Sequence, residues 1–304
     1  MGNSTFIYEY RHGLAYFEFS LAGVAACLLV FTIVFTLMKE IPARSQSYNL
    51  ATMFSPSNTL IILLLICVQG YLVSDANYHI NGRDTSWNKA ETFFMACNQT
   101  FYAHYSWLRG KEVFKMQTST RTYRTLKYVL QILPALSLGP FIVLLISMTR
   151  EQTSLAYLLT GASSGLATII LDVFYCFSFL RQIFNMVDNT ISVPVSYRTI
   201  ANYGLGASIC ALLLVLTFVC NVLLVDDESP SQNALLAYAI SNGLFGTLLV
   251  LNGIILVMMK VALIKPAFLH GTTTAANIRK FLDTTEKLAA PEIQVSNRTL
   301  LSKL

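Results

Sequence analysis

Apolar residues occur in this chain as blocks of about 20, and the charged residues fall in the gaps between the blocks. A helix of about 20 residues is about 30 Å long, which matches the hydrocarbon thickness of a bilayer. Hydrophobic residues make up 54% of the 304 residues and charged residues 12%, about half of what a soluble domain carries. One water-soluble core could not hide this much apolar surface. The pattern therefore predicts an integral membrane protein.

Seven blocks are long enough to cross a bilayer. They must cross as helices, because lipid offers no hydrogen-bond partner to a free backbone N–H or C=O group. We predict an all-α membrane protein, a seven-transmembrane helix bundle over residues 1–264, followed by a cytosolic tail at 265–304. The predicted spans are Phe17–Met38, Thr59–Asp75, Ala90–Leu108, Tyr128–Met148, Ser154–Leu180, Tyr203–Val225 and Asn233–Lys260. The third is the most polar, and without it the charge pattern described next would be lost.

Lys and Arg are divided unequally between the two ends of these spans. The side that holds the N-terminus and three short loops carries only Arg11, Arg83, Lys89 and Arg150, and the other side carries the remaining 17 of 21. Basic loops stay in the cytosol, so we expect the N-terminus outside and the C-terminus inside, in the plasma membrane. The net charge of +5 then reflects contact with an anionic bilayer leaflet, and no nucleic-acid partner is expected.

Three signals near the chain ends bear on processing and location. Asn3-Ser4-Thr5 is an N-glycosylation sequon on the predicted outer side. Residues 275–289 form an amphipathic stretch that we expect to lie on the inner leaflet. Ser302-Lys303-Leu304 matches a peroxisomal address, but that address is read on soluble cargo. We therefore interpret the match as chance.

Polar side chains inside the spans share helix faces. The third span repeats them at steps of three and four residues, as in Glu91, Asn98 and Tyr102. Asp172 lies in the fifth span with no Lys or Arg at a similar depth, and ionisable groups in lipid are costly and mark functional sites. We predict a polar cavity open to the outside. Its predicted ligand-binding residues are Asp75, His79, Glu91, Asn98, Tyr102, Asp172, Tyr175 and Ser241.

Two interpretations of these polar residues stay open. Hydrogen bonds between helices that only hold the bundle together are common in membranes. That interpretation suits the asparagines in particular, namely Asn98, Asn221, Asn242 and Asn252. A ligand site suits Asp172 better, because an isolated carboxylate needs a cation, a proton or a hydrogen bond.

The sequence argues against an enzyme and against a resident cofactor. Of four histidines only His104 falls well inside a span, so neither a pair of haem ligands nor an intramembrane metal site is available. Retinal would need a lysine in the middle of the seventh span, and Lys260 stands at its cytosolic end. No CxxC pair, nucleophile elbow or phosphate-binding glycine loop occurs. We therefore expect no catalytic activity, no metal and no cofactor.

A basic segment follows the third span on the predicted cytosolic side. Its cations could contact lipid headgroups, or they could dock an acidic or amphipathic protein partner. On the second interpretation they are partner-coupling residues. These are Arg109, Lys111, Lys115, Arg121 and Arg124.

Seven spans, an outer N-terminus, a basic second cytosolic loop and an amphipathic stretch after the last span resemble the G-protein-coupled receptor superfamily. The motifs of its rhodopsin-like class are absent. Arg109 follows Leu108 and not an acidic residue, and Lys265-Pro266-Ala267-Phe268 replaces the usual end of the seventh span. The layout is therefore similar to a divergent receptor group, such as a fungal one.

The resemblance implies a receptor that senses an extracellular small ligand or peptide. It also implies a cytosolic partner such as a heterotrimeric G protein. The alternative is a small-solute or proton-coupled transporter with Asp172 and Asn98 near the midplane. Transporters usually show internal repeats and interrupted helices, and no repeat is visible in this sequence, which favours the receptor.

Overall fold

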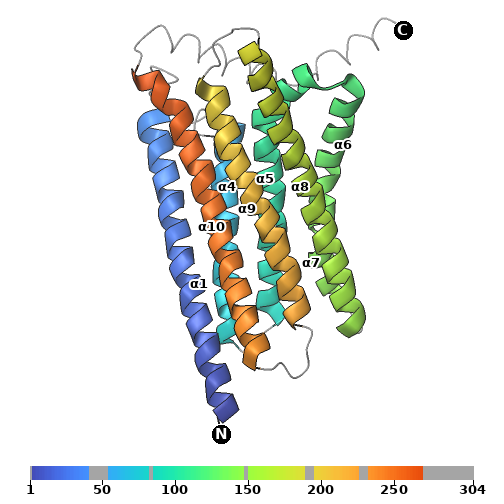
Figure 1. The fold of residues 1–304 in the computed structure, drawn as a ribbon. Coiled ribbons are helices and arrows are strands. Elements are labelled where there is room, and N and C mark those ends of the chain that lie inside the picture. The colour runs from blue at the N-terminus through green and yellow to red at the C-terminus, as the bar shows by residue number, and fades with distance from the viewer. Residues whose placement is uncertain are drawn as a thin grey trace, which may run out of the picture.

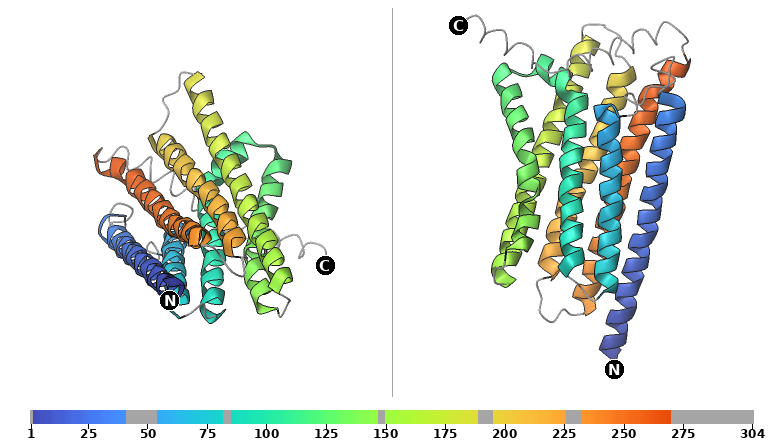
Figure 2. Two further views of the ribbon diagram at one scale, coloured as in Figure 1. Left: turned by 60° about the horizontal axis from the view of Figure 1, so that its bottom comes forward. Right: turned by 180° about the vertical axis from the view of Figure 1, so that it is seen from behind.

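The computed structural model of the chain describes residues 2–40, 54–81, 85–146, 150–188, 195–225 and 232–269, which fold almost entirely into helices. The helices stand side by side as long rods, and successive rods run in opposite directions (Figures 1 and 2). They are α1 (Gly2–Phe35), which continues into the π-helical turn η1 (Thr36–Glu40), α4 (Pro56–Ile80), α5 (Thr85–Gln117), α6 (Thr120–Ser137), α7 (Gly139–Leu145), α8 (Arg150–Asp188), α9 (Val195–Val225) and α10 (Gln232–Leu269).

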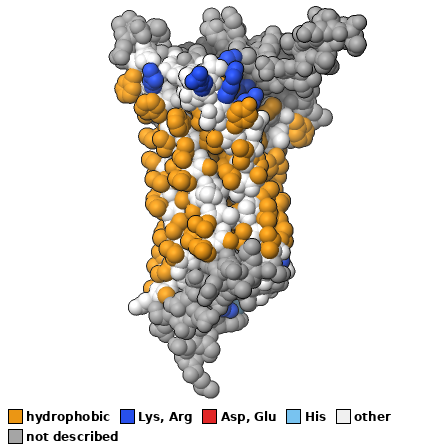
Figure 3. Space-filling model, turned by 90° about the vertical axis from the view of Figure 1, so that its right-hand side faces the viewer, with side chains coloured by type: hydrophobic (Ala, Val, Ile, Leu, Met, Phe, Trp, Pro, Cys, Tyr) orange, Lys and Arg blue, Asp and Glu red, His pale blue; other side chains and the backbone are white. Residues whose placement is uncertain are grey.

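Six helical segments of the described chain are long and apolar enough to cross a membrane. They are Tyr10–Glu40, Pro56–Ile80, Thr120–Leu145, Leu155–Asn185, Arg198–Leu224 and Asn233–Ile264. Their outer faces expose large apolar side chains, which form a broad band across the middle of the face seen in Figure 3. A water-soluble monomer does not expose so much apolar surface. The predicted all-α class is confirmed for the described residues, and the six candidate spans agree with a membrane protein. The count of seven spans and the orientation stay predictions.

The third predicted span lies within α5, and α5 is too polar to be one of these six segments. It nevertheless has 33 residues, a length of about 50 Å at 1.5 Å per residue. It packs against α4, α6, α7 and α8, and Figure 2 shows it standing parallel to its apolar neighbours. Most of the other helices extend beyond the predicted spans at one or both ends, whereas α7 ends at Leu145, before the predicted end at Met148.

The fourth predicted span is two helices in line. The backbone leaves the helical path between α6 and α7 at Leu138, shortly before Pro140. Proline has no N–H to donate, and its ring crowds the preceding turn. The Leu138 N–H bonds to the Pro134 carbonyl at 3.0 Å, so the break stays compact.

The basic residues gather at one end of the bundle. Figure 3 shows Lys and Arg side chains at the end where α10 finishes, which we call the C-terminal end, beyond the apolar band. The described helices place ten cations there, namely Lys39, Arg109, Lys111, Lys115, Arg121, Arg124, Lys127, Arg181, Arg198 and Lys260. The opposite, N-terminal end holds Arg11 and Lys89 among the described side chains.

Three predictions fall on parts that the structure does not describe. The amphipathic stretch at 275–289 and the Ser302-Lys303-Leu304 end lie outside the described residues, and so does the side chain of Asn3.

Candidate functional site

A buried polar group lies toward the N-terminal end of the bundle, between α4 and α10. The Asp75 carboxylate is 1% exposed, and its Oδ1 lies 3.2 Å from Nε2 of His79, one turn further along α4. Its Oδ2 accepts a hydrogen bond of 2.7 Å from Nδ2 of Asn242 on α10. Oδ2 of Asp75 therefore has a donor and Oδ1 lies against the His79 imidazole, so the sequence-predicted residues Asp75 and His79 lie together.

The same group extends to α9. Nδ2 of Asn221 donates to Oδ1 of Asn242 at 3.2 Å. Beside it, the Ser241 hydroxyl donates to the Thr217 backbone carbonyl of α9 at 3.3 Å. Ser241 therefore joins α9 and α10 and does not contact Asp75. For Ser241 and Asn221 the contacts are of the kind that holds helices together.

Two more carboxyl groups approach Asp75 from other helices. Glu91 on α5 interacts with the Asp75 charge and with the Tyr71 hydroxyl of α4. Glu18 on α1 is fully buried and lies close enough to Asp75 and Glu91 for their charges to interact. We call Glu18, Asp75 and Glu91, with His79 and Asn242, the carboxylate cluster.

Glu18 was missed by sequence analysis. It stands second in the first predicted span, where a charged residue is ordinarily taken to be at the water interface. The available signal was its position. An uncharged run of apolar and small residues follows it as far as Met38, and the next basic residue is Lys39.

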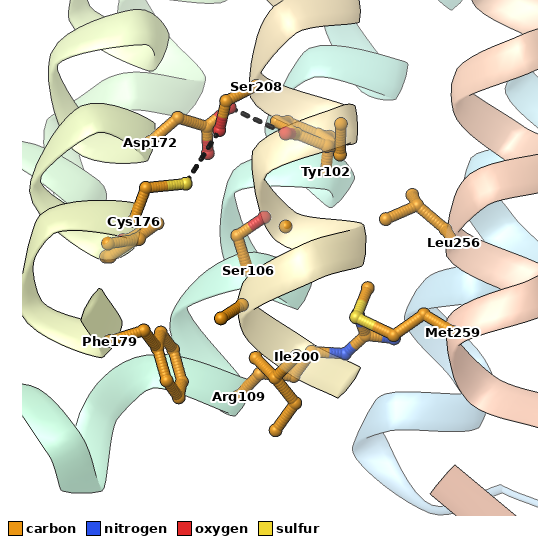
Figure 4. A pocket seen from close by; sticks show the side chains of 14 residues that line it. Tyr102, Ser106, Arg109, Asp172, Cys176, Phe179, Ile200, Ser208, Leu256 and Met259 are labelled. Atoms are coloured by element: carbon orange, nitrogen blue, oxygen red, sulfur yellow. Dashed lines mark hydrogen bonds between the residues drawn. The ribbon is translucent and has the colours of Figure 1, made fainter. Parts of the chain in front are cut away.

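A second polar group surrounds Asp172 on α8. The Tyr102 hydroxyl of α5 donates to Oδ2 of Asp172 at 2.6 Å, and both side chains are buried. One turn on, the Cys176 thiol lies 3.3 Å from the Ser208 hydroxyl of α9. Figure 4 shows these pairs on the wall of a cavity that also has Met259 of α10 in its lining. We call this the Asp172 cavity.

The cavity is small. It offers about 40 Å³ for the centres of water molecules, which is enough for about three waters at the volume that one buried water needs. A drug-sized ligand would require several hundred Å³. In this conformation the cavity suits water or a small solute.

Arg109 turns into the bundle at the C-terminal side of the Asp172 cavity (Figure 4). Its guanidinium lies over the Tyr105 ring, 3.6 Å from the centroid, and its Nη1 donates to the Met259 sulfur at 2.7 Å. A thioether is a weak acceptor. Arg109 therefore connects α5 to α10 instead of facing a cytosolic partner.

The other predicted partner-coupling residues differ in how exposed their side chains are. Lys115, Arg121 and Arg124 are exposed at the C-terminal end, whereas Lys111 is buried. Only the exposed three are accessible to a partner in this conformation.

Hydrogen bonds between α5 and α8 occur at depths between the carboxylate cluster and the Asp172 cavity. Near the N-terminal end the Thr92 and Tyr157 hydroxyls are 3.4 Å apart. Deeper in the bundle Gln99 donates to the Thr168 hydroxyl at 2.9 Å and accepts from Ser164 at 3.1 Å.

The eight predicted ligand-binding residues do not form one site. Asp75, His79 and Glu91 belong to the carboxylate cluster, while Tyr102, Asp172 and Tyr175 line the Asp172 cavity. Glu91 and Tyr102 are eleven residues apart on α5, or about 16 Å along the helix axis. The remaining two, Asn98 and Ser241, are buried elsewhere, and the Asn98 side-chain oxygen has no hydrogen-bond partner.

A third buried polar group closes the C-terminal end. The Lys260 ammonium lies 2.9 Å from Oε2 of Glu40, and it donates to Thr36 Oγ1 at 2.8 Å and to Asn58 Oδ1 at 2.6 Å. Three helical segments, α10, η1 and α4, therefore meet at one cation. Lys260 therefore holds these three segments together.

No set of three His, Cys, Asp or Glu side chains in the described part of the chain is placed to hold a metal ion. Comparisons with known proteins found no family model, no curated protein and no solved structure that matches this chain. The carboxylate cluster and the Asp172 cavity are therefore the two candidate functional sites of the described chain.

Proposed function

We propose that the chain is a seven-span receptor of the plasma membrane, with its N-terminus outside and its C-terminal end in the cytosol. Support for α5 as the remaining span comes from where its polar side chains point. Gln99 and Tyr102 bond to α8 and Glu91 interacts with α4, so these groups are satisfied inside the bundle and not exposed to lipid. The basic C-terminal end supports the orientation.

One observation carries the receptor proposal: the same two helices contribute to both polar groups. α5 supplies Glu91 to the carboxylate cluster and Tyr102 to the Asp172 cavity, while α10 supplies Asn242 to the first and Met259 to the second. A ligand that alters contacts at the outer group would shift α5 against α10. That shift changes the Arg109–Met259 contact near the cytosolic end, which is a two-state element of the kind that transmits a signal.

The cytosolic partner in this proposal is an acidic protein surface, such as that of a heterotrimeric G protein. Lys115, Arg121 and Arg124 are exposed where such a surface would dock. Complementary charge at an interface mainly raises the association rate and sets specificity.

The test is basal nucleotide exchange on heterotrimeric G proteins of the same organism, with the full chain in nanodiscs and no added ligand. We expect exchange above that of empty nanodiscs, and several-fold less with the double variant Arg121→Glu, Arg124→Glu. A matched control is Lys89→Glu, which changes a cation at the N-terminal end and should leave exchange unchanged. Exchange equal to that of empty nanodiscs contradicts the proposal.

The α5–α8 hydrogen bonds favour a second candidate, a transporter for protons or small solutes. Thr92, Gln99 and Asp172 offer polar groups at successive depths between the two ends of the bundle. Uptake into proteoliposomes under an imposed pH gradient would distinguish the two. Uptake by the wild type that Asp172→Asn abolishes, with no nucleotide exchange, would establish the transporter.

A further inference from the structure

The carboxylate cluster holds more negative than positive charge. It brings Glu18, Asp75 and Glu91 together with one imidazole, that of His79. Among the described residues no Lys or Arg forms an ion pair with any of the three carboxyl groups. Uncompensated carboxylates are very costly away from water, so the cluster needs a bound positive species.

Asp75 has the contacts of an ion and Glu18 does not. Asp75 accepts a hydrogen bond from Asn242, and the His79 imidazole lies 3.2 Å from its other oxygen. Such contacts stabilise a carboxylate. Glu18 is 0% exposed, and neither of its oxygens has a hydrogen-bond partner. The missing positive charge is therefore needed at Glu18.

The space around Glu18 restricts what that species can be. Its carboxyl packs against the backbone of α10 at Gly246, where an added Cβ would lie 2.7 Å from Oε2. An organic ammonium group or a hydrated ion would not fit between α1 and α10 at that contact. A metal ion would need further ligands, and the described side chains provide no set of three.

We propose that the carboxylate cluster is a proton-binding site and that Glu18 holds the proton. Asp75 and His79 lie beside it, with Oδ1 and Nε2 3.2 Å apart, and Tyr71, Glu91 and Tyr238 are the other titratable groups facing the cluster from α4, α5 and α10. The inference does not depend on whether the chain signals or transports.

The proton also determines how α1 packs. Neutral Glu18 can lie against Gly246, one turn beyond Asn242 on the same face of α10. Loss of the proton places a negative charge beside Asp75 and Glu91 in an apolar contact. The cluster then repels α1, so the bundle is tighter when the proton is bound.

The experiment counts protons on the full chain in nanodiscs, unfolded by SDS in weak buffer near pH 7 with a pH-sensitive dye. A carboxyl group that is protonated only in the folded state must release its proton on unfolding. We expect the wild type to release about one proton per chain more than Glu18→Gln. The control is the double variant Glu40→Gln, Lys260→Met, which removes both members of a buried ion pair. It should release as many protons as the wild type, because it leaves neither a lone buried carboxylate nor a lone buried ammonium.

Thermal melting gives a second readout. Because the folded state binds the extra proton, the wild-type melting temperature should fall as pH rises above neutral. Glu18→Gln imitates the neutral acid, so it should fold and lose that part of the pH dependence. Equal proton release by both proteins overturns the proposal, as does failure of Glu18→Gln to fold. Stabilisation of the wild type, but not of Glu18→Gln, by Na⁺ or K⁺ over choline would assign the site to a metal cation instead.

Discussion

At the scale of single residues, the contacts that join the helices are few and polar. Glu18 meets Gly246 between α1 and α10, and Lys260 meets Glu40 between α10 and η1. Lipid-facing leucines contribute little to helix association, because lipid tails are as apolar as they are. Substitutions at the polar contacts should therefore affect stability more than substitutions on the outer faces.

Gly246→Ala should destabilise the bundle. The new Cβ would lie 2.7 Å and 2.8 Å from the two carboxyl oxygens of Glu18, so one of the helices must shift, at a cost of about 1–3 kcal/mol. Thermal unfolding in detergent measures the effect. Gly23→Ala on α1 is the control, since a Cβ there meets nothing within 4 Å, and it should be neutral or stabilising. Equal melting temperatures for Gly246→Ala and the wild type would contradict the contact.

Lys260→Met should be more damaging. It removes the cation that pairs with Glu40 and satisfies Thr36 and Asn58, and it leaves a buried carboxylate unpaired. Breaking a buried pair in this way costs about 3–5 kcal/mol. Adding Glu40→Gln to Lys260→Met should recover most of the lost melting temperature, since the unpaired charge is then gone. A double variant no more stable than Lys260→Met would exclude this explanation.

At the scale of elements, α5 has the most unusual position. It is the most polar of the long helices, and it is covered by α4 on one side and by α6, α7 and α8 on others. Polar side chains of α5 form hydrogen bonds with those helices, so the bundle interior supplies the hydrogen-bond partners that water would otherwise provide. α6 and α7, which are interrupted at Leu138 just before Pro140, also pack against α5.

Two native cysteines test the packing of α5 on α4. The Cys67 thiol of α4 and the Cys97 thiol of α5 lie close enough to interact. Oxidation with copper phenanthroline in membranes should link them, and mass spectrometry of the digested chain should find the linked peptides. Cys97→Ser should abolish the link, whereas Cys220→Ser, on α9, should not. A digest without this link, or with Cys97 linked to another cysteine, would contradict the packing.

At the scale of the whole molecule, the unequal charge of the two ends sets the proposed orientation. The cation-rich end contains the ends of α1, α5, α8 and α10 and the starts of α4, α6 and α9. This arrangement alternates correctly only if α5 crosses the bilayer like its neighbours. The span count and the orientation are therefore tested together.

Epitope tags on the two ends of the chain provide that test. We expect an N-terminal tag to bind antibody on intact cells and a C-terminal tag to bind only after permeabilisation. If α5 did not cross, the chain would have six spans and both tags would lie on the same side. Untagged cells control for background, and a cytosolic marker confirms that the intact cells are sealed.

The sequence alone determined the class, the approximate position of the helices and the uneven charge, because these follow from hydropathy and from local order along the chain. It also identified most of the polar residues, including Asp75, His79 and Asp172. It did not indicate that they form two groups, whose α5 members Glu91 and Tyr102 are about 16 Å apart along the helix axis. Nor did it indicate that Arg109 turns inward to Met259.

Those features depend on contacts between residues far apart in sequence. Glu18 is recognised as unusual only because the fold places Gly246 and Asp75 beside it. Lys260 is recognised as part of a buried ion pair only because the fold places Glu40 beside it. A hydropathy pattern describes one helix at a time, whereas each of these contacts joins at least two helices. Hydropathy therefore cannot predict them. The tertiary structure decided which buried charges are paired and which are not, and that difference is what marks Glu18 as the group that needs a proton.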